Sequence, residues 1–144
     1  MNDEGRTLIE VVMAMALVLV MMAFTGASLM AANAKQRGRV VATDLANELR
    51  AARYLAIMRR EHIRVVLEPG TATMRVEPAG APGQKIREFD FREKGLTIER
   101  TSSGTDILFH PSGRAASPAT ITLINHQKER WQLTVSLIGR VSQI

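Results

Sequence analysis

The sequence predicts an α+β protein in which one long N-terminal helix packs on antiparallel β-sheets. Two observations lead to this prediction. Residues 6–60 contain no proline and are either continuously apolar or periodic, as expected of one unbroken helix. From residue 61 onward the pattern changes to short β-type runs separated by turn residues. A helix followed by a series of strands is typical of an α+β domain.

The first half of the predicted helix is apolar and uncharged. Residues 11–34 contain no Asp, Glu, Lys, Arg or His. A helix of that length can cross a hydrocarbon layer of about 30 Å, because each residue adds about 1.5 Å. We therefore predict a transmembrane or filament-core helix over residues 6–34.

The second half of the helix is amphipathic. Apolar residues recur at intervals of four and three, at Val41, Leu45, Leu49, Ala52 and Ala56. Such a stripe has the 3.6-residue period of a helix that buries one face. We assign residues 35–144, including this half of the helix, to one globular domain.

Short runs with β-type composition follow the helix. We predict strands over residues 62–68, 73–77, 86–91, 96–99, 107–110, 120–124 and 131–138. The first two flank Pro69-Gly70-Thr71 and are predicted to form a hairpin. Pro111-Ser112-Gly113 is predicted to be a β-turn, and Gly139-Arg140 a bulge at a strand end.

Composition argues against enzyme chemistry and against cofactors. The chain has no cysteine, so disulfides and cysteine-based metal sites are excluded. His62, His110 and His126 have neither metal-motif spacing nor a suitably spaced acidic residue, which favours surface or turn positions. No serine lies in a nucleophile-elbow pattern. We predict that the protein is not an enzyme and binds no metal or cofactor.

Glu10 is a carboxylate at the very start of the apolar run. A charge is costly in lipid and is seldom kept there without a partner. One interpretation is that Glu10 pairs with a positive group during assembly. The other is that Glu10 lies at the membrane interface, where the dipole at a helix N-terminus favours a negative charge.

The run Gly5-Arg6-Thr7-Leu8-Ile9-Glu10 resembles the class III signal of type IV pilins and type II secretion pseudopilins. The resemblance implies that residues 1–5 are a leader, which prepilin peptidase removes by cutting between Gly5 and Arg6. It also implies N-methylation of Arg6 and a role for Glu10 in filament assembly. Family members usually carry Phe where this chain has Arg6, so methylation stays open.

The C-terminal third carries a second resemblance. Four runs in order are similar to the ending of the GspH/FimT group of minor pseudopilins and minor pilins: residues 109–114, 119–123, 131–135 and 138–141. This resemblance implies a pilin-like fold. It also implies partner subunits, the other major and minor pseudopilins or pilins of a helical filament.

Together the resemblances imply a minor pseudopilin of the type II secretion system, near the tip of a periplasmic pseudopilus that supports protein export. They imply a single pass through the bacterial inner membrane, with the N-terminus cytoplasmic and residues 35–144 periplasmic. The positive-inside rule alone favours the opposite orientation, because Lys35, Arg37 and Arg39 follow the apolar run.

Two other functions remain open. One is a minor pilin of a type IV pilus, active in assembly, twitching or adhesion. The other is a DNA-binding minor pilin for natural transformation, in which Arg140 would contact the nucleic acid. The arginine excess motivates this third function. DNA-binding members of the group carry a second basic residue where this chain has Ser142, so we do not expect nucleic acid to be the partner.

Overall fold

The first element is one long helix. The computed structural model describes residues 8–144, without the side chains of residues 24–32. Helix α1 spans Leu8–Arg59, which confirms the predicted continuous helix over the described residues. The helix ends where Arg60 adopts a left-handed φ of 53° and the Glu61 amide donates to the Ala56 carbonyl over 3.3 Å. Such a left-handed residue closes the last turn and stops the helical path.

The chain divides into two compact units, Met1–Gln36 and Arg37–Ile144. Across the part of the chain that the structure describes, no helix combines the length and the apolarity needed to cross a membrane. Two parts of the predicted transmembrane segment 6–34 lie outside the described structure. They are residues 6 and 7 and the side chains of residues 24–32.

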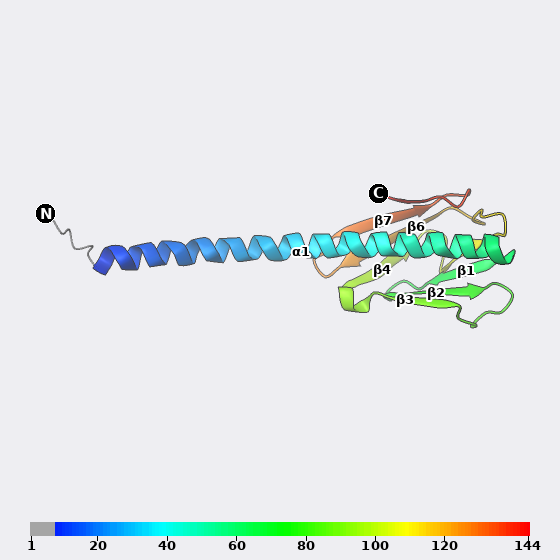
Figure 1. The fold of residues 1–144 in the computed structure, drawn as a ribbon, viewed down its shortest axis with the longest axis horizontal. Coiled ribbons are helices and arrows are strands. Elements are labelled where there is room, and N and C mark those ends of the chain that lie inside the picture. Colours follow the sequence, from blue (N-terminus) through cyan, green and yellow to red (C-terminus); the bar gives the residue numbers. More distant parts are fainter. Residues whose placement is uncertain (1–7) are drawn as a thin grey trace. The chain divides into compact units, whose positions relative to one another are not determined.

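The unit Arg37–Ile144 contains two antiparallel sheets (Figure 1). The first has the strand order β3-β2-β1-β5 and the second has the order β4-β6-β7-β8. A one-turn helix, η1 (Arg92–Lys94), joins the two sheets. The strands are β1 (Ile63–Leu67), β2 (Thr73–Pro78), β3 (Arg87–Asp90), β4 (Leu96–Thr101), β5 (Asp106–Phe109), β6 (Ala119–Asn125), β7 (Arg130–Val135) and β8 (Val141–Gln143).

The core lies between the apolar stripe of α1 and both sheets (Figure 1). Each residue of the predicted stripe is buried, from Val41 to Ala56, with at most 2% exposure. β1, β2 and β5 bury Val65, Met74 and Phe109 in the same core, and β6 and β7 bury Leu123 and Leu133. Burying one such side chain contributes about 1.5–3 kcal/mol, so this core fixes the sheets on the helix.

The two sheets are also joined through their backbones. The Ile98 amide in β4 donates to the Thr71 carbonyl, and the Ile98 carbonyl accepts from the Gly70 amide, each over 2.8 Å. Gly70 and Thr71 lie in the turn between β1 and β2. The predicted hairpin turn therefore also holds the second sheet in place.

The end of the chain differs from its prediction. The predicted strand 131–138 stops at Val135, and an additional strand, β8, follows at Val141–Gln143. The chain reverses here because Gly139 takes a left-handed φ of 76° and its amide donates to the Ser136 carbonyl over 2.8 Å. Gly139 thus provides the bulge of a three-residue hairpin loop, a geometry that usually requires glycine.

Candidate functional site

The start of α1 presents an exposed apolar surface. Each large apolar side chain from Leu8 to Met22 is at least 45% exposed, and Leu8 reaches 83%. Apolar patches of this kind on a protein surface mark sites of contact with another protein or with a membrane. This surface is therefore suited to burial against another apolar partner.

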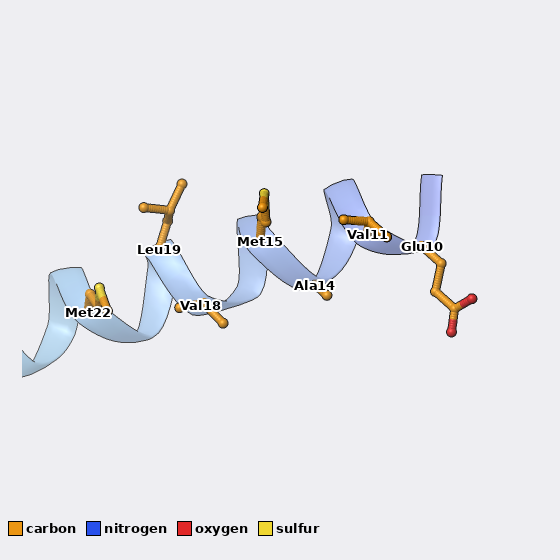
Figure 2. Close-up of a pocket in the computed structure, with 7 residues that line it drawn as sticks. All are labelled: Glu10, Val11, Ala14, Met15, Val18, Leu19 and Met22. Carbon is orange, nitrogen blue, oxygen red and sulfur yellow. The ribbon is translucent and has the colours of Figure 1, made fainter. Parts of the chain in front are cut away.

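Glu10 lies at one end of a shallow groove along this helix surface (Figure 2). The other lining residues follow at intervals of three and four along one side of the helix, and they are Val11, Ala14, Met15, Val18, Leu19 and Met22. Figure 2 shows the Glu10 carboxylate extending away from the helix axis beyond this apolar row. A second helix in the groove would bury apolar area and bring its own charges near Glu10.

The predicted cleavage site cannot be placed in this geometry. Gly5 and Arg6 lie outside the described residues. Of the predicted site residues in the N-terminal region, the structure describes Glu10. This residue lies in the first turn of α1.

A second candidate region is formed by two hairpin turns with the same backbone. In residues 110–114, the His110 amide donates to the Arg114 carbonyl and the Gly113 amide donates to the His110 carbonyl, each over 2.8 Å. Residues 136–140 repeat the pattern at 2.9 and 2.8 Å. Gly113 and Gly139 are both left-handed, and an exposed arginine follows each, Arg114 and Arg140. The predicted β-turn at Pro111–Gly113 is thereby confirmed.

Both turns meet α1 at Arg53. The Arg53 Nε donates to the Gly113 carbonyl over 2.9 Å. A Cβ atom on Gly139 would lie 2.0 Å from that same carbonyl and 2.9 Å from Arg53 Nε. Sequence reasoning singled out Arg140 but missed Arg53 and Arg114. The repeated Gly-Arg pair at 113–114 and 139–140 was the available signal.

The structure also brings two histidines together. His62 and His110 lie one residue beyond the Ile63–Phe109 end of the β1–β5 ladder, with ring centroids 5.0 Å apart in an edge-to-face arrangement. Their distance of 48 positions in the sequence gave no sign of this contact. Over the described residues, no three His, Cys, Asp or Glu side chains gather as a metal-binding group.

One ion pair on the second sheet has a resolved electrostatic consequence. Arg130 donates to Glu99 from Nε over 2.8 Å and from Nη2 over 2.7 Å. This hydrogen bonding lowers the pKa of Glu99 and raises the pKa of Arg130. Glu99 in β4 and Arg130 in β7 lie on either side of β6, so the pair connects these two strands across β6 in the second sheet, and we assign it a structural role.

Comparison with known proteins identifies a family. The family model described as Type II transport protein GspH matches residues 41–139, which is more than half of the chain. No curated protein sequence matches the chain.

Solved structures share the fold. The chain is similar to the type IV minor pilin FimU of Pseudomonas aeruginosa, with a TM-score of 0.62 and 20% identity over 74% of this chain and 87% of that one. It is also similar to the minor pseudopilin EpsH from the Type 2 Secretion System of Vibrio cholerae, with a TM-score of 0.61 and 18% identity over 74% and 94%. A second structure of EpsH gives a TM-score of 0.62 and 16% identity over 76% and 94%. These likenesses establish the predicted pilin-like α+β fold.

Proposed function

This chain belongs to the GspH family, a pilin-like family, and from that premise we propose that it is a minor pseudopilin of a type II secretion system. In this role it is a structural subunit near the tip of a periplasmic pseudopilus that supports protein export. The family is one of structural subunits, so the proposed role is assembly rather than catalysis. The observation that carries the proposal is the exposed apolar surface from Leu8 to Met22 with Glu10 at its end.

The apolar surface suits two successive environments. Before assembly, it is stabilised by the lipid of the inner membrane, with residues 35–144 in the periplasm. During assembly, it leaves the lipid and packs on the same surface of neighbouring subunits. Both environments are apolar, so moving the surface from lipid into the filament changes its hydrophobic free energy little. Packing between helices is then sufficient to favour the filament.

Glu10 sets the register of that packing. Cleavage by prepilin peptidase after Gly5 leaves a new amine on Arg6, which carries a positive charge. A carboxylate and an amine in an apolar bundle offset part of each other's desolvation cost, and an unpaired charge there is strongly destabilising. The stagger between neighbouring subunits is therefore the one that brings an Arg6 amine to each Glu10. Methylation of that amine preserves its charge.

The test is processing of the full chain in cells that express prepilin peptidase. We expect the recovered protein to begin at Arg6, and the Gly5→Leu variant to retain the leader. Intact-protein mass spectrometry distinguishes the two forms, and the same spectrum reports methylation of Arg6. Recovery of unprocessed chain in the presence of active peptidase would overturn the proposal.

A second candidate is a minor pilin of a type IV pilus. The similarity to FimU favours it, because the TM-score of 0.62 for FimU matches the 0.61 and 0.62 for EpsH. Deleting the gene separates the two candidates. Loss of protein export with normal surface pili indicates a pseudopilin, whereas loss of surface pili or twitching with normal export indicates a pilin.

A further inference from the structure

We propose that the end of α1 and the two Gly-Arg turns form a docking surface for a different subunit in the same filament. The face of that subunit has apolar side chains at its centre and acidic side chains around them. The inference rests on the proposed function and names the surface through which this chain contacts its neighbour. We call this surface the distal patch. It consists of Tyr54, Ile57 and Met58 on α1, Leu137 and Ile138 in the second turn, and the arginines Arg53, Arg114 and Arg140.

The patch is built on a fixed scaffold. Arg53 on α1 donates to the Gly113 carbonyl over 2.9 Å, and the Ala115 amide donates to the Leu137 carbonyl over 3.0 Å. The three segments are therefore held together by hydrogen bonds, and the Gly113 and Gly139 backbones approach too closely for a side chain to fit between them. A preformed surface loses little conformational entropy when a partner binds.

Exposed apolar side chains are frequent on these three segments. Within the described unit Arg37–Ile144, seven large apolar side chains are exposed, and five of them belong to the distal patch. Met58 is 81% exposed, Tyr54 is 65% and Ile138 is 63%. Tyr, Met and Arg are the residue types enriched at protein–protein interfaces, and Tyr and Arg dominate their binding energy.

The charge of the patch defines the partner. Residues 53–61, 110–114 and 136–140 carry five arginines and one acidic residue, Glu61. Among the described residues, Arg53, Arg114 and Arg140 take part in none of the ion pairs, whereas Arg64, Arg75, Arg87, Arg92 and Arg130 all do. Arg114 and Arg140 are also exposed, so their guanidinium groups are available to carboxylates of a partner.

Two other occupants fit less well. A second copy of this chain through the same patch would set arginine against arginine, which costs free energy. Duplex DNA would pair with the arginines but would leave the aliphatic side chains and Met58 without a suitable contact, because phosphate contacts dominate DNA binding.

The experiment is photo-cross-linking of the full chain in cells that assemble the filament. p-Benzoylphenylalanine replaces Met58 or Ile138, both of which are exposed, so the fold is preserved. The control position is Gln127, an exposed residue in the turn 125–129, which has the same backbone hydrogen-bond pattern but lies outside the patch. We expect adducts from Met58 and Ile138 with one other pilin-like subunit, identified by mass spectrometry, at a yield at least about tenfold above that of Gln127.

Charge reversal provides the second arm. The double change Arg114→Glu and Arg140→Glu should lower the adduct yield at Met58 by about tenfold or more, whereas Lys128→Glu in the control turn should leave it unchanged. An adduct with a second copy of this chain, an adduct lost on DNase treatment, or equal yields at Gln127 would each overturn the inference. So would the absence of any adduct from chain that is recovered in a filament fraction isolated from the opened cell envelope. Absence of the chain from that fraction would overturn the proposed function, and the docking surface with it.

Discussion

The indole ring of Trp131, on β7, lies directly against the backbone of α1 at Gly38. A Cβ atom on residue 38 would lie 2.1 Å from the Cζ2 atom of that ring. The second sheet therefore approaches the helix more closely than any other residue at position 38 would allow. This contact and the buried stripe of α1 together fix the helix on the sheet.

Replacing Gly38 by Ala should destabilise the protein. The added methyl group forces Trp131 to move, which costs about 1–3 kcal/mol, and this exceeds the gain of up to about 1 kcal/mol from better helix propensity. Chemical denaturation followed by the fluorescence of Trp131, the one tryptophan of the chain, measures the effect. Gly80→Ala is the control, because nothing lies within 4 Å of a Cβ there. Equal stability of the two variants would contradict this account.

Replacing Gly139 by Ala should cost more than the same change at Gly70. Both glycines have a left-handed φ, 76° and 83°, so each substitution incurs a backbone cost of about 1–2 kcal/mol. Only at Gly139 would the new Cβ also approach a backbone atom, the Gly113 carbonyl at 2.0 Å. We expect an additional loss of about 1–3 kcal/mol in the free energy of unfolding. Chemical denaturation of both variants gives their free energies of unfolding, and the difference between the two values measures this additional loss.

Replacing Leu49 by Ala should remove about 2–5 kcal/mol from the free energy of unfolding. Leu49 is fully buried at the centre of the apolar stripe of α1, so its removal leaves a cavity between the helix and the sheets. Met58→Ala, on the exposed side of the same helix, should change stability by less than about 0.5 kcal/mol. Similar losses in the two variants would show that the stripe is not the packed face.

The Glu99 carboxylate should titrate below the ordinary value of 4.5, because hydrogen bonds from Arg130 favour its charged form. A carboxyl group whose pKa is lower in the folded state stabilises the fold above its unfolded pKa. This stabilisation is lost as the pH falls through the lower, folded pKa. NMR titration of the Glu99 side chain measures the shift directly. In the Arg130→Gln variant the pKa of Glu99 should rise, and the variant should differ from the wild type in stability at neutral pH but not at strongly acidic pH.

Replacing Glu10 by Gln should block incorporation into filaments without preventing cleavage. The amide keeps the size of the side chain but loses the charge that pairs with the Arg6 amine of a neighbour, so we expect at least a tenfold loss, about 1.4 kcal/mol or more. Immunoblots of filament fractions isolated from the opened cell envelope measure incorporation, and mass spectrometry checks cleavage. Glu93→Gln, an exposed acidic residue in η1, is the control. Normal incorporation of the Glu10 variant would show that charge pairing by Glu10 is not needed for assembly.

Much of the local structure followed from the sequence. The stripe from Val41 to Ala56, the hairpin of β1 and β2, and the turn at Pro111–Gly113 were predicted and are confirmed. Each depends on residues a few positions apart, so periodicity and turn chemistry suffice. Glu10 was likewise identified by its place in the sequence, as a charge beside an apolar run. Its role in assembly stays a prediction.

The tertiary structure decided which distant segments meet. Sequence predicted antiparallel strands but not their division into the orders β3-β2-β1-β5 and β4-β6-β7-β8. It also gave no sign that Gly113 and Gly139 converge on Arg53, or that Trp131 covers Gly38. Such contacts join residues 26 to 93 positions apart, and spacing along the chain carries no information about them. They are selected because one arrangement of both sheets on the helix buries the core completely, and that choice belongs to the packed molecule as a whole.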